Sequence, residues 1–211
     1  MENAEEGGGR AFAWACFGAG VTKARNRFAS SGCFVYELRV PIDLRELVEA
    51  PKTLPVRPAW VATDSTWFDL NGSLDLASGE TVQGLELRGG ACQSLPDRAV
   101  RFILQHYPAK GQCVGLVRIE WRPLAAHTNP ANCAPHLSMK RIVGSHIHGF
   151  DMNWLADLDR LRTGNLPVAE PLSIDPSSFQ ELLVVVGREL KIAGLEKIEP
   201  PPWREADFFG I

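Results

Sequence analysis

The sequence lacks the patterns that mark several protein classes. Its cysteines are odd in number and contain no C-x-x-C pair, which argues against a disulfide framework and against a zinc-ribbon site. No apolar run approaches the ~20 residues that a membrane helix needs, so we expect no membrane-spanning segment. The chain opens on acidic residues where a secretory signal has basic ones. These absences predict a cytoplasmic protein with reduced thiols.

The chain also has little net charge. Its 22 Lys and Arg residues face 25 Asp and Glu residues, which gives a net charge of -3 at pH 7. This balance argues against a protein that coats nucleic acid with phosphate contacts, although it leaves room for a small basic groove. The length of 211 residues suits one domain with an ordinary core. We expect a disordered, acidic and glycine-rich tail over residues 1–10 and a single domain over residues 11–211.

Alternating and β-branched residues predict strands in the first part of the chain. The expected strands cover residues 34–40, 59–63, 66–70, 82–87, 98–107 and 114–121. The mixed period of residues 98–107 fits a helix as well, and we favour a strand there. The second and third flank Asp64-Ser65 and form a candidate hairpin, whereas Gly89-Gly90 is expected to end the fourth. In the last strand Ile119 and Trp121 share one face, and Arg118 lies on the other, which is typical of a half-buried strand.

Helical spacing after residue 150 predicts two helices. Asp151 is a candidate N-cap for the first helix, which we expect to run to Gly164. Asp175 and Pro176 are suited to begin the second helix, and Gly194 is suited to end it. Strands first and helices last predict an α+β fold, in which an antiparallel sheet from the N-terminal and middle segments is covered by C-terminal helices.

Four of the five histidines fall in one short stretch, at positions 127, 136, 146 and 148. Imidazole is the side chain that ordinarily titrates near neutral pH, so this stretch is the best candidate for chemistry. If residues 145–150 are extended, His146 and His148 project from one face about 6–7 Å apart. If the strand that contains Arg118 pairs with them, His127 in the following loop comes close to both.

One chemistry that fits these residues is metal-free cleavage of a phosphodiester, as in an endoribonuclease. Two imidazoles would act as general base and general acid, and an arginine would stabilise the negative charge that develops. The catalytic candidates are Arg118, His127, His146 and His148. The candidates for binding RNA are Arg122, Asn129, Lys140 and Arg141.

A second chemistry uses a divalent metal. His127, His146 and His148 would ligate the ion, with Asp151 as a fourth or outer ligand, and the ion would activate water as in a hydrolase. Two further interpretations stay open. The same patch can be a non-catalytic surface that binds nucleic acid or protein, and the apolar tail over residues 200–209 can contact a protein partner or a second copy of the chain. Ordinary surface histidines, or histidines that are simply hydrogen-bonded at the end of a strand, would also produce this pattern.

A set of spaced motifs spans the segment from Arg118 to about Leu190. It consists of a strand with Arg118, His127-x-Asn129-Pro130, His146-Ile147-His148, Trp154 and a helix over residues 179–190. This segment, roughly a third of the chain, resembles an uncharacterised bacterial family from mobile elements and phage-related loci. In that family Asp-Gly follows Asn-Pro, whereas this chain has Ala131-Asn132. The resemblance implies a toxin-like or defence-related role without a defined activity.

Overall fold

The computed structural model describes residues 43–108, 113–157, 161 and 164–203. All of them belong to one compact unit, Arg39–Ile211. The expected tail over residues 1–10, the expected strand over residues 34–40 and the last part of the apolar tail lie outside the described residues. Among the described residues no helix is long and apolar enough to cross a membrane.

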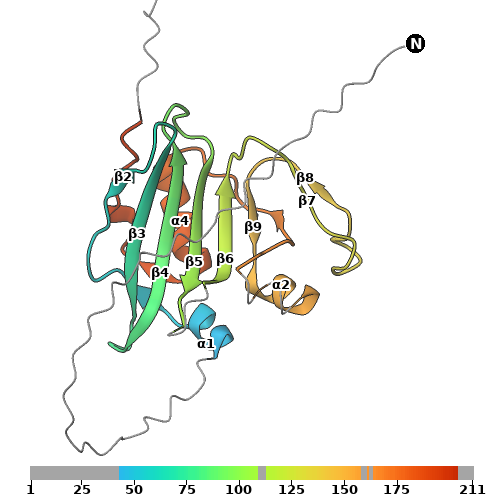
Figure 1. The fold of residues 1–211 in the computed structure, drawn as a ribbon, viewed down its shortest axis with the longest axis horizontal. Helices are drawn as coiled ribbons and strands as arrows, with labels where there is room; N and C mark the ends of the chain where they lie inside the picture. Colours follow the sequence, from blue (N-terminus) through green and yellow to red (C-terminus); the bar gives the residue numbers. More distant parts are fainter. Residues whose placement is uncertain (1–42, 109–112, 158–160, 162–163, 204–211) are drawn as a thin grey trace, which may run out of the picture. The chain divides into compact units, whose positions relative to one another are not determined.

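A large, mostly antiparallel sheet forms the centre of this unit (Figure 1). The strand order is β10-β9-β6-β5-β4-β3-β1-β11, and β2 pairs with β3 off this path. The strands are β1 (Lys52–Thr53), β2 (Trp60–Ala62), β3 (Trp67–Leu76), β4 (Thr81–Cys92), β5 (Val100–His106), β6 (Val114–Trp121), β9 (His146–His148), β10 (Glu170–Pro171) and β11 (Ile192–Ala193). Two further strands, β7 (His127–Thr128) and β8 (Arg141–Ile142), pair with each other. The β1–β11 pair is parallel, and the other pairs are antiparallel.

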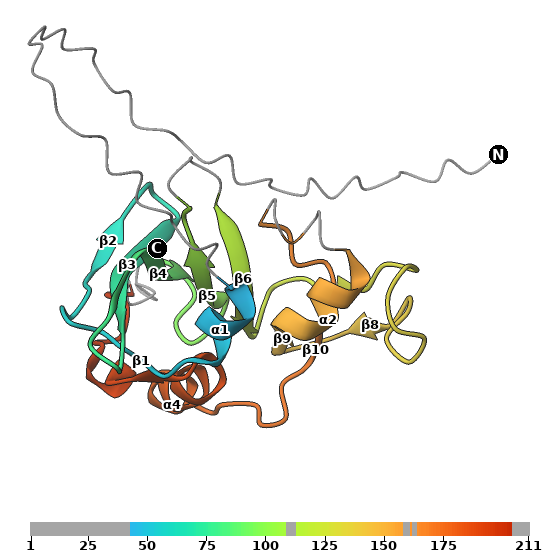
Figure 2. The ribbon, with the colours of Figure 1, turned by 90° about the horizontal axis from the view of Figure 1, so that it is seen from below.

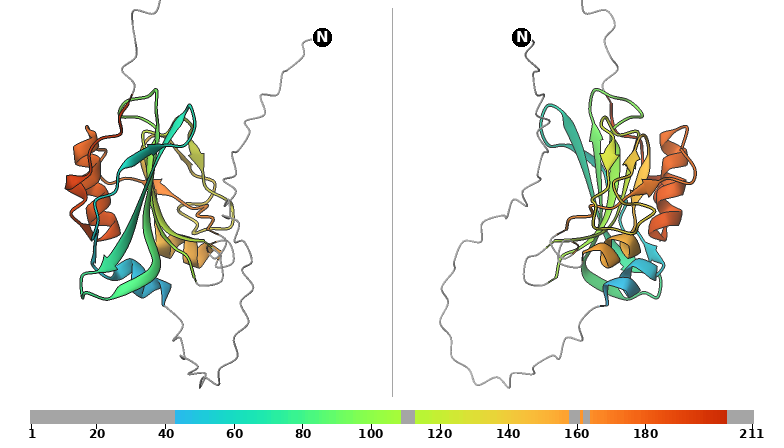
Figure 3. Two further views of the ribbon diagram at one scale, coloured as in Figure 1. Left: turned by 60° about the vertical axis from the view of Figure 1, so that its left-hand side comes forward. Right: turned by 90° about the vertical axis from the view of Figure 1, so that its right-hand side faces the viewer.

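The helices whose bounds lie within the described residues are α1 (Leu44–Glu49), α2 (Phe150–Ala156) and α4 (Phe179–Leu190), and a 3-10 turn follows at Leu195–Lys197. Helix α4 lies against one face of the sheet (Figures 2 and 3). Its buried side chains include Phe179, whose ring packs 6.3 Å from that of Trp60 and 6.4 Å from that of Phe102. The predicted α+β fold, with a C-terminal helix covering an antiparallel sheet, is confirmed. Trp203 also packs on Phe179, at 5.8 Å between ring centroids, so this part of the tail contacts its own domain.

The predicted hairpin around Asp64-Ser65 is confirmed, because β2 pairs with β3 in antiparallel register. The expectation that Gly89-Gly90 ends a strand is wrong, since β4 continues to Cys92. Packing explains why a glycine occurs at position 89 inside this strand. A Cβ atom on Gly89 would lie 2.9 Å from Trp60 Cη2, so the absent side chain makes room for the indole ring within a continuous strand.

The predicted helix ends are also displaced. Gly149 precedes α2, and the helix ends at Ala156, well before Gly164. Ser178 caps α4 by accepting a hydrogen bond from the Glu181 backbone, whereas Asp175 accepts one from the Ser145 hydroxyl at 2.5 Å. Ser and Asp are equally good N-caps, so the sequence pattern alone cannot choose between Asp175 and Ser178, and the prediction of Asp175 is wrong.

Lys191, in a left-handed conformation with φ 54°, ends α4. Gly194, which we expected to end that helix, has φ 86° and instead precedes the 3-10 turn. Both residues adopt the left-handed backbone that follows many helices, and the first of the two in the chain takes the capping position.

Candidate metal centre

Strand pairing places the central residues of the site on one face of the sheet. In the β6–β9 pair, Arg118 lies opposite His148 and Glu120 lies opposite His146. Residues directly opposite each other on antiparallel strands share a face, and neighbours along a strand alternate between faces. The two histidines therefore project together beside Arg118 and Glu120. The sequence predicted this arrangement for His146, His148 and Arg118.

His127, which begins β7, completes the cluster. Its ring centroid lies 5.5 Å from that of His146 and 4.8 Å from that of His148, which are themselves 5.1 Å apart. One nitrogen from each ring can be chosen so that all three lie within 4.8 Å of one another. The side chains of His146 and His148 are 1% and 0% exposed, and His127 is partly buried. The predicted convergence of these three imidazoles is present, in a more buried setting than a surface cleft.

Backbone groups hold all three rings. His146 Nδ1 donates to the Gly144 carbonyl at 2.8 Å, and His127 Nε2 donates to the Pro167 carbonyl at 2.9 Å. His148 hydrogen-bonds the backbone of Leu166. A carbonyl oxygen can only accept, so the ring nitrogen beside it carries the proton. In a neutral imidazole the other nitrogen then carries a lone pair, which is the form that ligates a metal.

Two buried asparagines fix the segment that supplies two of these backbone groups. Asn129 donates to the Ala169 carbonyl and accepts from the Ala169 N–H, both at 2.8 Å. Asn153 does the same with Val168, at 2.9 and 2.8 Å. Both side chains also donate to a second carbonyl, of Leu137 and Gly149 respectively. The segment that follows Leu166 is therefore held in place from two sides.

Asn129 was predicted to bind RNA, yet it is 1% exposed and its amide binds backbone groups. Its Oδ1 atom also lies 3.1 Å from His127 Nε2. Asn153 was missed by the sequence reasoning. The available signal was a polar residue between Met152 and Trp154 on a helix whose buried face needs apolar residues.

Glu120 was also missed as a member of the site. Its Oε2 atom lies 3.8 Å from His146 Nε2, and its Oε1 atom lies 3.8 Å from His148 Nε2. Arg118 bridges the same groups, with Nε 2.9 Å from Glu120 Oε1 and Nη2 2.9 Å from His148 Nε2. The alternation of β6 already placed Glu120 on the same face as Arg118, and this shared face could have identified Glu120 as a member of the site.

The surroundings favour neutral imidazoles. Burial lowers the pKa of His148 well below 6.5, and the positive charge of Arg118 lowers it further. Burial also lowers the pKa of His127, although the hydrogen bond to Pro167 opposes this shift. At pH 7 both rings are therefore neutral and able to ligate a metal.

The other predicted site residues lie outside this cluster. Asp151 forms an exposed ion pair with Arg45, and it is not part of the group of converging ligand atoms in the described part of the chain. Lys140 and Arg141 are exposed. The guanidinium of Arg122 lies 4.8 Å above the Trp121 ring and donates to the carbonyl of Pro176 at 3.1 Å.

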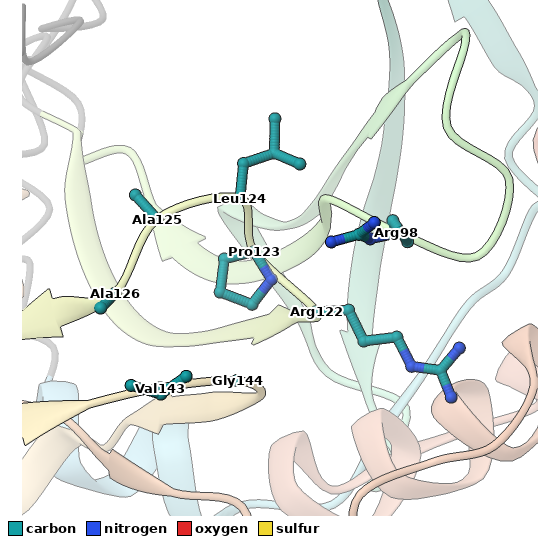
Figure 4. Close-up of a pocket in the computed structure, with 8 residues that line it drawn as sticks. All are labelled: Arg98, Arg122, Pro123, Leu124, Ala125, Ala126, Val143 and Gly144. Carbon is teal, nitrogen blue, oxygen red and sulfur yellow. The ribbon is translucent and has the colours of Figure 1, made fainter.

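A pocket of about 360 Å³ is lined by residues next to the cluster in the chain, although none of the three imidazoles lines it (Figure 4). Its lining residues are Arg98, Arg122, Pro123, Leu124, Ala125, Ala126, Val143 and Gly144. The lining is continuous with the site along the chain, because Ala126 precedes His127 and Gly144 supplies the carbonyl that binds His146. The arginine side chains lie together on one side of the pocket in Figure 4.

Comparison of this chain with family models, with curated proteins and with solved structures finds no match. The resemblance to a family from mobile elements therefore stays a prediction.

Proposed function

We propose that this protein is a metal-dependent hydrolase whose divalent ion is held by His127, His146 and His148. The observation that carries this proposal is the hydrogen bonding of the three rings, each of which binds the backbone through one nitrogen. Histidines that ligate metals almost always donate their second N–H in this way, which fixes the tautomer and the ring orientation. Three protein ligands that leave an open position are typical of catalytic rather than structural metal sites.

The open side of the site is its charged edge. His146 and His148 are almost fully buried, whereas the side chains of Arg118 and Glu120 are 25% and 27% exposed. A substrate would therefore approach over these two residues. A divalent ion there would polarise the bond to be hydrolysed and activate water, and the guanidinium of Arg118 would favour a negatively charged substrate such as a phosphodiester.

Metal-free acid–base cleavage of RNA is the second candidate. The contact between Arg118 Nη2 and His148 Nε2 supports it, since such a pair could bind a phosphate. However, that mechanism needs one protonated imidazole, and the lowered pKa values of His127 and His148 oppose protonation. The near-complete burial of His146 and His148 also restricts their contact with a polymer. A non-catalytic binding surface for nucleic acid or protein would draw on the exposed Lys140 and Arg141.

The cysteines bear on the cellular location. Among the described residues, Cys92 and Cys133 are free thiols. Free thiols persist in a reducing compartment, so we place the protein in the cytoplasm.

The proposal is tested by metal titration. We expect Zn²⁺ or Co²⁺ to bind wild-type protein at one ion per chain in calorimetry, and to raise its free energy of unfolding by about 2.7 kcal/mol at a hundredfold excess over Kd. His146→Ala and His148→Ala should lose both effects. The matched control is His136→Ala, because His136 is exposed and lies outside the cluster. Hydrolysis of bis(p-nitrophenyl) phosphate should follow the bound metal in the same order.

Two results would contradict the proposal: wild-type protein that binds no metal, or His146→Ala and His148→Ala variants that bind it as wild type does. Hydrolysis of RNA that survives complete chelation, but is lost in His148→Ala, would instead support the acid–base mechanism.

A further inference from the structure

The nitrogen of His146 that faces the site has no hydrogen-bond partner in the described part of the chain. His146 donates through Nδ1 to Gly144, and its Nε2 atom is buried and unpaired. The group that faces this nitrogen is a carboxylate oxygen of Glu120, at 3.8 Å. When the ring is neutral, this nitrogen and the Glu120 carboxylate can both only accept a hydrogen bond, and they face each other although His146 is only 1% exposed. Such an arrangement is unfavourable unless a cation lies between them.

Arg118 supplies part of the missing positive charge. Its Nη2 atom reaches His148 Nε2 at 2.9 Å and its Nε atom lies 2.9 Å from Glu120 Oε1. This second contact is a charge contact without hydrogen-bond alignment, because Arg118 Nε finds no aligned acceptor among the described residues. The guanidinium therefore stands beside two of the acceptors and leaves His146 Nε2 unpaired.

We infer that Glu120 is the fourth ligand of the metal and that Arg118 is the cation which the metal displaces. This inference rests on the proposed function. Ligand atoms that share one ion with bonds of about 2.1 Å are roughly 3–3.5 Å apart. Glu120 Oε2 lies 3.8 Å from His146 Nε2, and Glu120 Oε1 lies 3.8 Å from His148 Nε2. Glu120 is not yet part of the group of converging histidine nitrogens, so its side chain has to turn one oxygen toward them to bind the same ion.

A fourth protein ligand limits which metal ions are suited to the site. Three imidazoles and one carboxylate fill a tetrahedral site, so an ion that prefers five or six ligands is needed if substrate is to bind as well. First-row ions such as Mn²⁺, Fe²⁺ and Co²⁺ accept nitrogen and oxygen ligands in such geometries. Release of Glu120 from Arg118 would at the same time free the guanidinium to contact an anionic substrate.

The experiment is a Co²⁺ titration that follows visible absorption, which reports the ligands and the coordination number. Wild type is compared with Glu120→Gln, Glu120→Asp and Arg118→Gln. The control is Glu86→Gln, which changes a partly buried carboxylate on the same sheet face, two strands away. We expect Glu120→Gln to bind Co²⁺ at least about tenfold more weakly, with a changed spectrum, and Glu120→Asp to lie between it and wild type. Arg118→Gln should bind Co²⁺ several-fold more tightly, because no cation has to leave.

Wild-type affinity and spectrum in Glu120→Gln would overturn its role as a ligand. Unchanged or weaker binding by Arg118→Gln would overturn the displacement. Both results are distinct from failure of the proposed function, in which wild type binds no Co²⁺ or His146→Ala binds it as well as wild type does. Circular dichroism of each variant shows whether the fold is intact, and Glu120→Asp keeps the test valid if Glu120→Gln does not fold.

Discussion

Asn129 and Asn153 bind two consecutive residues of one backbone segment in the same way. Each amide side chain donates to the carbonyl and accepts from the N–H of a single residue, Ala169 for Asn129 and Val168 for Asn153. The two residues before this pair, Leu166 and Pro167, supply the backbone groups that bind His148 and His127. The orientation of two imidazoles thus depends on side chains that do not belong to the ligand set.

We therefore expect Asn153→Ala to affect both stability and metal binding. The substitution removes three hydrogen bonds and leaves buried backbone groups without partners, which should lower the free energy of unfolding by about 3 kcal/mol. Loss of the groups that orient metal ligands typically weakens metal binding by about 10- to 100-fold. Urea unfolding of the metal-free protein and Co²⁺ titration measure the two effects.

Asn132→Ala is the matched control, because Asn132 is exposed. It should change the free energy of unfolding by less than about 0.5 kcal/mol. An equal effect of Asn132→Ala and Asn153→Ala would show that the bonds to Val168 do not matter.

The buried imidazole of His148 should make the metal-free protein sensitive to acid. Burial holds the pKa of His148 well below 6.5 in the folded protein, whereas the unfolded chain restores the ordinary value. Between these two pKa values the unfolded state binds more protons, so the free energy of unfolding rises with pH in this window and falls as the pH drops below about 6.5. One such group gives a slope of at most about 1.4 kcal/mol per pH unit.

We expect guanidinium unfolding in the presence of a chelator to show this slope between pH 7 and pH 5. The slope should be smaller in His148→Leu and unchanged in His136→Leu, since His136 is exposed. Equal slopes in His148→Leu and wild type would assign the acid sensitivity to other groups.

Lys52 should make the free energy of unfolding depend on pH in the alkaline range. Its side chain is 1% exposed and donates to the carbonyls of Val48, Ala50 and Leu190 near the ends of α1 and α4. Burial lowers the pKa of Lys52 from 10.5 to about 8, and the charge of Lys191 adds to the shift. Between these pKa values the unfolded state binds the extra proton, so Lys52 makes the free energy of unfolding rise with pH.

Lys52→Met should remove this rise. The difference in unfolding free energy between the variant and wild type should change by up to roughly 1.4 kcal/mol per pH unit between pH 8 and 10.5. Lys197→Met, which changes an exposed residue, should follow wild type. Parallel pH profiles for wild type and Lys52→Met would mean that Lys52 keeps its proton throughout this range.

The sequence predicted the parts of the site that depend on strand periodicity. Alternation along residues 114–121 placed Arg118 on the polar face, and the H-x-H spacing placed His146 and His148 together on a neighbouring strand. Their convergence with His127 followed once the two strands were taken as partners, and the register confirms that pairing.

The other features of the site and the fold could not be predicted from the sequence. The groups that orient the imidazoles are backbone carbonyls, such as that of Pro167, and any residue type supplies a carbonyl. Glu120 looks like an ordinary charged residue on a half-buried strand until its distance to the imidazoles is known. The error at Gly89 has a similar origin, because a glycine that admits the Trp60 ring cannot be distinguished by sequence from one that ends a strand.

The way in which the imidazoles are held also determines which positions evolution can change freely. Residue 166 contributes to the centre through its main chain, so many side chains there would leave the geometry intact. The amides at positions 129 and 153 have no such substitute, because only Asn combines this donor and acceptor in so short a side chain. Distant relatives with the same centre should thus keep His-x-Asn, His-x-His and an Asn five residues further on, even where the rest of the segment has diverged beyond recognition.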